Sequence, residues 1–262
     1  MNNTFALAAG EIAREAGLFL KRFSENHRLQ VERKGSDFDF VTNADRESQA
    51  MVSARLRAAF PEHRFVGEED GLSDAEVAER LSGDEYCWVC DPLDGTINYI
   101  HGIEMYAVSI GLVRGGRSVA GAAYLPETDE LFTAARGEGA FMNGQPIRAS
   151  GCASLREAFV SIEMPVSDLE RRAAFMPTLT RVGMACSSMR MTGCAVYSLM
   201  QVARGRMDAY VNLGLHAWDV AAAQVILEEA GARLTDIRSN PFAYDMTWGV
   251  LAAAPGLEGA FR

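Results

Sequence analysis

The sequence has no long uninterrupted run of apolar residues. Its apolar stretches fall short of the roughly 20 residues that a helix needs to cross a bilayer, so we expect no membrane span. The N-terminal residues also lack a basic segment followed by an apolar core, since the first basic side chain is Arg14. A secretory signal needs both features. We therefore expect a soluble, cytoplasmic protein without a membrane partner.

An excess of positive charge is also absent. Lys and Arg number 25 against 35 Asp and Glu, which gives a net charge of −10. Such a chain repels the backbone of nucleic acids and anionic lipid head groups, so we expect no nucleic-acid partner. A phosphate ester can still bind to an acidic protein, because bound divalent cations reverse the local field.

Cysteines are few, and their number, five, is odd. This is a poor framework for disulfides, so we predict reduced thiols. Cys87 and Cys90 have a CxxC spacing, but no second pair completes a zinc site. The segment is typical of a strand, in which residues three apart face opposite sides. We therefore expect both thiols to be buried in apolar surroundings.

Hydrophobic periodicity divides the chain into two parts with different character. Residues 1–150 begin with amphipathic helices at 4–24 and from about 45 to 60, and continue with short β-rich runs that indicate neighbouring strands. Asn143-Gly144 is the strongest hairpin-turn signal. Residues 151–262 alternate strands and helices. We predict two α/β subdomains, 1–150 and 151–262, stacked in layers.

Two carboxylates follow an apolar strand in Asp91-Pro92-Leu93-Asp94-Gly95-Thr96. Pro92 has no N–H, which predicts that the strand ends there, and Gly95 permits a turn or a close approach to a ligand. The two carboxylates, with the Leu93 carbonyl between them, form the oxygen set that a hard divalent cation binds. The same residues are also common in simple surface turns.

Three further acidic sites stand at strand ends or helix starts. Glu68 lies in the acidic loop 67–71 after an apolar strand, a composition that solvated loops share. Asp219 and Asp45 each stand where a helix begins, and capping that helix would explain either residue alone. Together with Asp91 and Asp94, the four sites fit one edge of an α/β sheet, where ligands bind.

These motifs, in the order Gly-Glu-Glu, Asp-Pro-x-Asp-Gly-Thr and Trp-Asp, resemble the inositol monophosphatase family of lithium-sensitive, fructose-bisphosphatase-like phosphatases. The resemblance runs from Lys34-Gly35 to Asp219 and on to the C-terminal strands. It implies a layered α/β/α/β/α sandwich, a homodimer, and two or three Mg²⁺ ions per active site. The metal ligands that it implies are Glu68, Asp91, Leu93 through its carbonyl, Asp94, Asp219 and, for a weaker ion, Asp45.

The resemblance also implies a mechanism without a covalent intermediate. The metals neutralise phosphate oxygens and activate a water that attacks phosphorus in line. Thr96 and Glu68 orient and deprotonate this water, with Asp91 as the third catalytic residue. The backbone N–H groups of Gly95 and Thr96 hold the phosphate if they begin a helix. The implied substrate contacts are Asp94, Gly95, Thr96, Ala195, Asn212 and Asp219.

Asn212 departs from the family pattern, in which a Glu usually grips the inositol ring. An amide can donate and accept, but it lacks the charge that strengthens a hydroxyl contact. Inositol 1-phosphate remains the first candidate substrate. Histidinol phosphate, glycerol phosphate, other sugar phosphates and 3′-phosphonucleotides stay open.

The histidines do not suggest a nucleophile triad or a zinc pair. His27 and His63 have the sequence surroundings of surface residues. We expect His216 to pack beside Trp218 or to bind substrate, because imidazole suits softer ions than Mg²⁺.

Two rival functions are compatible with parts of the pattern. Haloacid dehalogenase-like phosphatases use Asp-x-Asp-Gly-Thr with a covalent aspartate, but here one extra residue separates Asp91 from Asp94. A metal-binding, dimeric regulator without significant turnover would have the same sequence motifs. Because Thr96 and all the implied metal ligands are present, we favour catalysis.

Overall fold

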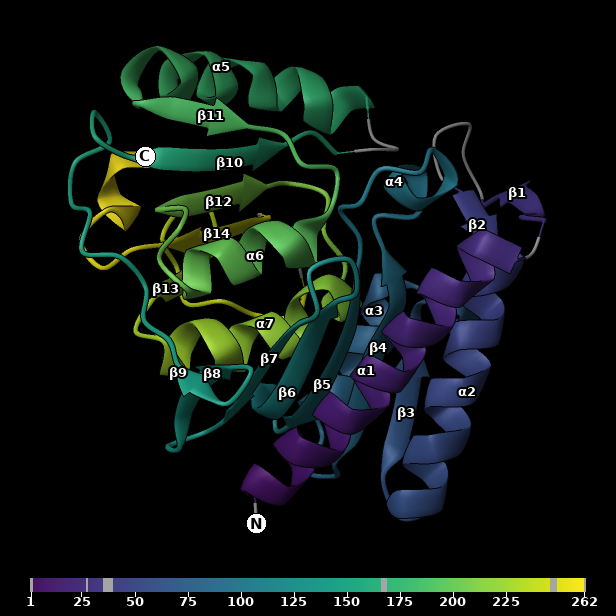
Figure 1. Cartoon of the computed structure of the whole chain (residues 1–262). Helices are drawn as coiled ribbons and strands as arrows, with labels where there is room; N and C mark the ends of the chain where they lie inside the picture. The colour runs from purple at the N-terminus through teal and green to yellow at the C-terminus, as the bar shows by residue number, and fades with distance from the viewer. Residues whose placement is uncertain (1, 27, 35–39, 166–168, 246–248, 262) are drawn as a thin grey trace.

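The computed structural model describes residues 2–26, 28–34, 40–165, 169–245 and 249–261. Its elements form five layers, helix–sheet–helix–sheet–helix (Figure 1), which confirms the layered fold. The α-helices are α1 (Asn2–Asn26), α2 (Asn43–Ala59), α3 (Asp74–Ser82), α4 (Thr96–Ile100), α5 (Leu169–Ala185), α6 (Ala195–Ala203) and α7 (Ala217–Glu229). The strands are β1 (Val31–Arg33), β2 (Phe40–Thr42), β3 (Arg64–Gly67), β4 (Cys87–Asp94), β5 (Ala107–Arg114), β6 (Arg117–Leu125), β7 (Glu130–Ala135), β8 (Gly139–Met142), β9 (Gln145–Pro146), β10 (Phe159–Glu163), β11 (Ser188–Arg190), β12 (Ala209–Asn212), β13 (Arg233–Thr235) and β14 (Val250–Ala253).

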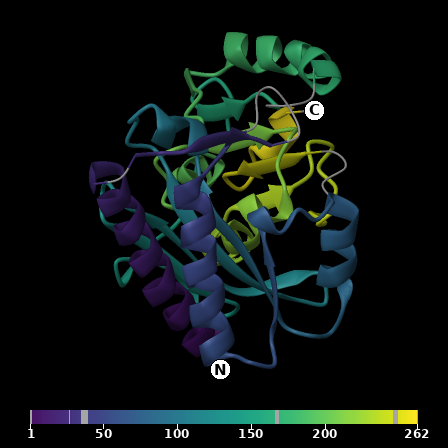
Figure 2. The same ribbon diagram turned by 90° about the vertical axis from the view of Figure 1, so that its right-hand side faces the viewer.

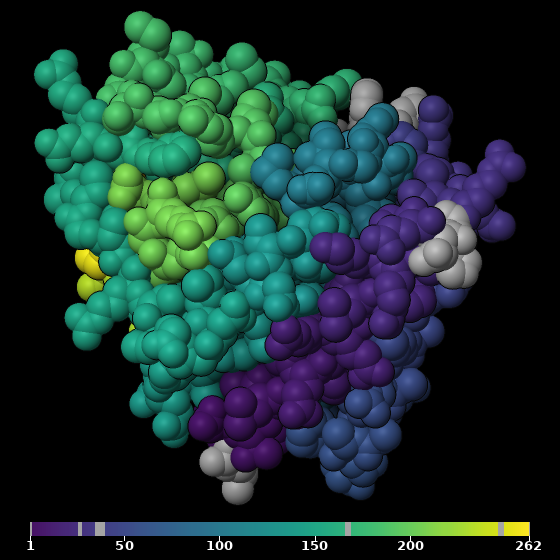
Figure 3. Space-filling model, viewed as in Figure 1, coloured from purple at the N-terminus to yellow at the C-terminus, as the bar shows by residue number. Residues whose placement is uncertain are grey.

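The larger sheet has seven strands in the order β3-β4-β5-β6-β7-β8-β9. Only β3 and β4 are parallel, and the others follow one another as antiparallel neighbours. The predicted turn at Asn143-Gly144 joins β8 to β9, and both residues have positive φ, as the favoured two-residue hairpin turn requires. On the outer face, α1 and α2 lie side by side (Figure 2), and α1 packs against β5, β6 and β7. In the space-filling view, the purple residues of α1 form a diagonal band beside the teal residues (Figure 3).

The smaller sheet has five strands in the order β11-β10-β12-β14-β13, and α5 covers its outer face (Figure 1). Strand β10 is parallel to β11 and β12, so the C-terminal ends of β10 and β12 lie together. Their last residues, Glu163 and Asn212, are register partners. This sheet is built from residues after 150 and the larger one from residues before it; the two-subdomain division itself stays a prediction.

Helices α6 and α7 fill the layer between the sheets. Gly111 and Gly121 allow α7 to approach the larger sheet closely, because a Cβ atom at either position would come within 3 Å of α7 atoms. The contacted residues on α7 are Ala221 and Ala222, which are themselves small. This close approach fixes the N-terminal turn of α7, which carries Asp219, beside strand β4.

Three local expectations need correction. Asp45 does not cap α2, because Thr42 is the N-cap and Asp45 occupies the third helical position of the capping box. Strand β4 does not end before Pro92 but continues to Asp94. A bulge between Asp91 and Asp94 accommodates Pro92, which has no N–H to donate to the neighbouring strand. Short strand β11 was not anticipated, because its three residues carry no alternation of their own.

The cysteine predictions are confirmed. All five cysteines are free, and Cys87 and Cys90 are buried in different core clusters, as opposite strand faces require. Within the described part of the chain, no helix has both the length and the apolar character needed to cross a membrane.

Candidate metal centre

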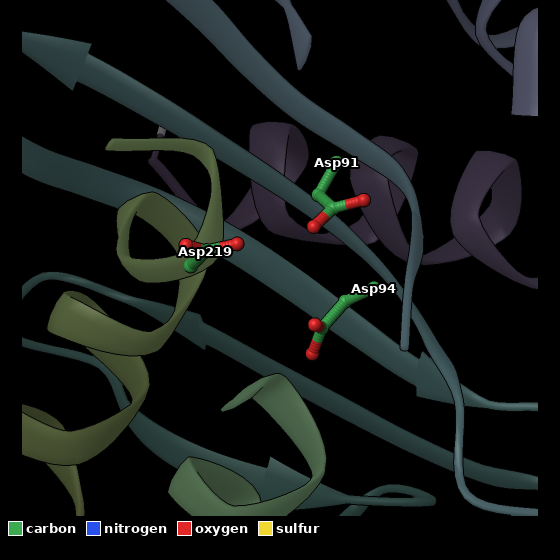
Figure 4. A group of neighbouring side chains, drawn as sticks. All are labelled: Asp91, Asp94 and Asp219. Atoms are coloured by element: carbon green, nitrogen blue, oxygen red, sulfur yellow. The ribbon is translucent and has the colours of Figure 1, made fainter. Parts of the chain in front are cut away.

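Three predicted acidic residues meet at one point. Asp91 and Asp94 come from β4 and Asp219 from the first turn of α7, and one oxygen of each lies within 4.8 Å of the others. Figure 4 shows their carboxylates directed toward a common centre. Asp91 and Asp219 are buried, and Asp94 is partly buried. Residues far apart in the sequence therefore form a compact acidic cluster.

The bulge in β4 explains how Asp91 and Asp94 converge. In a regular strand, residues three apart point to opposite faces. Here Asp91 pairs with Ser109 and Asp94 with Ala107, so β4 carries one extra residue over this interval. The extra residue returns both aspartates to the same side, and the Leu93 N–H donates to Asp91 Oδ1 at 2.9 Å, which fixes the loop.

Asp219 is held by the start of its own helix. His216 is the N-cap, and its backbone N–H donates to Asp219 Oδ2 at 2.7 Å. Asp219 is therefore at the third helical position rather than at the N-cap. Its Oδ1 atom takes no part in the hydrogen bond from His216. The ring of His216 stacks on Trp218 with centroids 4.8 Å apart, which confirms the expected packing.

The carboxylates of the cluster strongly disfavour ionisation without a cation. Burial raises the pKa of Asp94 to about 8 and that of Asp219 to about 6. Burial and the neighbouring carboxylate of Glu68 raise the pKa of Asp91 well above its ordinary value. A divalent cation would relieve both the desolvation and the mutual repulsion.

Asp45 and Thr96 form a second group beside the cluster. The Thr96 hydroxyl lies 3.1 Å from Asp45 Oδ1 and 3.1 Å from the Leu93 carbonyl oxygen. Asp45 Oδ2 accepts hydrogen bonds from the N–H and hydroxyl of Thr42, and burial raises the Asp45 pKa to about 6. The carboxylate in reach of Thr96 is thus Asp45, whereas the sequence suggested Glu68.

Glu68 approaches the cluster from the short helical turn that follows β3 (Glu68–Asp70). Its Oε1 accepts a hydrogen bond from Lys34 Nζ at 2.7 Å, and the same ammonium group binds Glu69. Gln49 and Asp70 hold this turn through bonds to its backbone. The acidic loop is therefore a fixed part of the site rather than a solvated segment.

The remaining predicted substrate contacts are Gly95, Ala195 and Asn212. Gly95 has φ +90° and is the N-cap of α4, so Thr96 begins a helix as expected. Ala195 is the first residue of α6. Asn212 is buried, and its side chain is engaged internally: its Oδ1 accepts from the Gly214 N–H and its Nδ2 donates to the Tyr210 hydroxyl.

Two residues at the site were not identified from the sequence. Cys194, the N-cap of α6, donates its thiol hydrogen to Asp94 Oδ2 at 2.9 Å, and the Val196 N–H donates to the same oxygen at 2.6 Å. Glu163 is buried at the end of β10, where its carboxylate accepts bonds from Thr192 and Tyr210. Neither residue gave a sequence signal, because strand pairing brings Glu163 to the centre and the packing of α6 brings Cys194 there.

The donor set suits a hard divalent cation. It consists of carboxylate oxygens with the Leu93 carbonyl beside them, and the nearby thiol is already bound to Asp94. No imidazole nitrogen belongs to the described acidic cluster. The residues present therefore fit a metal of the magnesium or calcium type better than zinc.

Comparison with known proteins identifies the family. The model of the inositol monophosphatase family matches residues 1–261. The chain belongs to the inositol monophosphatase family. This confirms the resemblance drawn from the motifs and the expectation of an inositol monophosphatase-like phosphatase.

Relatives of this family member carry two kinds of name. An inositol-1-monophosphatase of Mesorhizobium japonicum is 40% identical over 87% of this chain and 83% of its own length. The Nus factor SuhB of Vibrio cholerae is 36% identical over 93% of this chain and 88% of its own length. Among solved structures, the extragenic suppressor protein SuhB of Bartonella henselae has a TM-score of 0.88 and 32% identity, covering 98% of this chain and 96% of its own.

Proposed function

We propose that this family member is a Mg²⁺-dependent phosphomonoesterase that hydrolyses a small polyol phosphate, with inositol 1-phosphate as the first candidate. The observation that carries the proposal is the convergence of Asp91, Asp94 and Asp219 beside the Asp45–Thr96 pair. A purely structural acidic cluster would not need buried carboxylates that oppose one another, because that arrangement costs stability.

Magnesium is the proposed cofactor, at two or three ions per site. Glu68, Asp91, Asp94, Asp219 and the Leu93 carbonyl would hold it, with Asp45 assisting at a weaker position. When bound, the metal would neutralise the phosphate and lower the pKa of water. Lys34 pairs with Oε1 of Glu68 and acts as its counter-ion in the metal-free protein, and the second oxygen of Glu68 would serve as the metal ligand.

Thr96 and Asp45 are the proposed pair that positions and deprotonates the attacking water. The Thr96 hydroxyl donates either to Asp45 or to the Leu93 carbonyl, and its lone pairs would then be available to accept from the attacking water. With a pKa of about 6, Asp45 is ionised near neutral pH and can receive a proton through this hydroxyl. The start of α4 at Thr96 would place backbone N–H groups toward the phosphate.

The substrate's hydroxyl side would meet Asp94, the first turn of α6 and Asn212. Because Asn212 is buried and its amide already hydrogen-bonds to Gly214 and Tyr210, its side chain offers little to a further hydroxyl. A negative charge is nevertheless close, since Glu163 is the register partner of Asn212 on the neighbouring strand. This supports a polyol substrate in general and leaves the inositol ring, histidinol phosphate, sugar phosphates and 3′-phosphonucleotides to be separated by assay.

The test is phosphate release from inositol 1-phosphate, glycerol 2-phosphate, histidinol phosphate, fructose 1,6-bisphosphate and adenosine 3′,5′-bisphosphate, with Mg²⁺ and after chelation. We expect Mg²⁺-dependent release led by inositol 1-phosphate. Release led by another substrate would keep the chemistry and reassign the substrate. Metal-independent release, or none from any of them, would contradict the proposal.

The second candidate function is a metal-binding regulator. The observation that favours it is the name Nus factor carried by the SuhB relatives, which are similar over nearly the whole chain. A regulator would show negligible turnover on every substrate above, while Thr96→Ala would leave its partner binding unchanged. The expected absence of a nucleic-acid partner therefore remains a prediction.

A homodimer is the proposed oligomeric state, and the cytoplasm the proposed compartment. Helix α5 exposes Leu169, Met176 and Met184, whose spacing of seven and eight residues places them on one helix face. Met184 is 86% exposed. Such an apolar face is suited to association with a second copy. The free cysteines are compatible with a reducing compartment.

A further inference from the structure

A cavity of about 490 Å³ lies at the opposite end of β3 and β4 from the metal centre. It is lined by Arg57, Pro61, His63, Arg64, Phe65 and Arg80. Strand β4 begins at Cys87, which pairs with Arg64, and its aspartates come four and seven residues later. At about 3.3 Å per residue, they lie roughly 13 to 23 Å from the cavity end of the strand. The cavity is therefore separate from the candidate active site.

Three arginines from different elements surround this cavity. Arg57 is in the last turn of α2, Arg64 is the first residue of β3, and Arg80 is in the last turn of α3. Arg64 forms an ion pair with Glu85. Among the described residues, the guanidinium groups of Arg57 and Arg80 have no hydrogen bond or ion pair. The charge of Arg80 acts only at longer range on Glu76, where it helps to lower the pKa of that carboxyl. Two positive charges thus remain available.

The charges of Arg64 and Arg80 also act on Cys87, at the start of β4. Burial raises the pKa of the Cys87 thiol to about 11, but the positive charges of Arg64 and Arg80 both act to lower it. A single buried thiol can sense both guanidinium groups only if both lie near the start of β4. The two side chains therefore share one small region, although the protein as a whole carries a net charge of −10.

His63 forms an uncharged wall of the cavity, which corrects its expected surface position. Its ring lies between Phe60, at 5.2 Å, and Tyr86, at 4.8 Å between centroids. Burial lowers the pKa of His63, so the ring is neutral at pH 7. Its Nδ1 atom is buried without a hydrogen-bond partner in the described structure. This ring adds polarity to the cavity lining without negative charge.

We propose that this cavity binds a compact, multiply charged oxyanion of the phosphate class. Guanidinium groups donate paired hydrogen bonds to such oxyanions. A single carboxylate has two oxygens and matches one guanidinium fork, whereas phosphate or pyrophosphate has enough oxygens for the two unpaired guanidinium groups of Arg57 and Arg80 together. The site is independent of the proposed hydrolase activity, because none of its residues belongs to the metal centre.

The test is calorimetric titration of the full-length protein with pyrophosphate at low ionic strength, after metal has been removed on a chelating resin. Without metal the acidic centre repels anions, so binding there does not interfere. We expect one site on the unmodified protein. Arg57→Ala and Arg80→Ala should each weaken binding at least tenfold, and the double variant should abolish it.

Arg55→Ala is the matched control. Arg55 is on the same helix, but it pairs with Glu15 and does not line the cavity. Because Arg57 and Arg80 are exposed, both variants should keep the unmodified far-ultraviolet spectrum. Equal affinity in the unmodified protein and the double variant, or no binding by the unmodified protein, would overturn the proposal. Citrate binding as tight as that of pyrophosphate would overturn the phosphate class.

Discussion

Replacing Asp219 by Asn should stabilise the metal-free protein and remove its response to Mg²⁺. The pKa of Asp219 is raised from 3.8 to about 6, chiefly by burial. At about 1.36 kcal/mol per pKa unit, keeping this group ionised at pH 8 costs about 3 kcal/mol. The amide removes the charge, and its oxygen can still accept the His216 N–H.

Part of this gain is offset, because a neutral acceptor binds the His216 N–H less strongly than a carboxylate does. We expect a net gain of about 2 kcal/mol, or roughly 4 to 8 °C in Tm for a chain of this size. The unmodified protein should instead gain about 2.7 kcal/mol from Mg²⁺ at 100 times Kd. The variant should gain almost nothing, since it lacks one ligand.

Thermal unfolding at pH 8, in EDTA and in a Mg²⁺ series, measures both effects. Asp84→Asn is the control, because Asp84 is an exposed aspartate in the loop before β4. The order of stability should reverse between the two conditions: variant above unmodified protein in EDTA, below it in Mg²⁺. A variant that is less stable in EDTA, or equally stabilised by Mg²⁺, would refute the electrostatic account of the centre.

Three further predictions concern the pH dependence of stability, the role of Thr96 and the proposed dimer. The pKa values of Asp45, Asp94 and Asp219 in the folded protein lie above the unfolded value near 4, so the folded protein binds more protons than the unfolded chain between pH 4 and 8. The Tm in EDTA should therefore fall as the pH rises from 5 to 8. A rising Tm would contradict this. Thr96→Ala should lower kcat by about 10²- to 10⁴-fold while leaving the Mg²⁺-induced Tm shift intact, and Thr96→Ser should restore activity. An unchanged kcat in Thr96→Ala would remove Thr96 from the mechanism. Met184→Asp should convert the proposed dimer to a monomer in light scattering, and an unaltered mass would place the interface elsewhere.

The sequence by itself determined the local structure and the family. The hairpin turn at Asn143-Gly144 is a short-range signal, and it appears as predicted. The order of the acidic motifs identified the family, which the comparisons confirm. These features could be predicted because each depends on residues close together in the chain, or on a linear pattern.

Only the tertiary structure decided how these residues meet. The sequence predicted that β4 ends at Pro92, whereas a bulge carries it on and brings Asp91 and Asp94 to one side. Pairing of β10 with β12 brings Glu163 beside Asn212, and packing of α2 against β4 gives Thr96 the carboxylate of Asp45. Strand register and helix packing are set by the whole core, so no local pattern records which distant side chains they bring into contact.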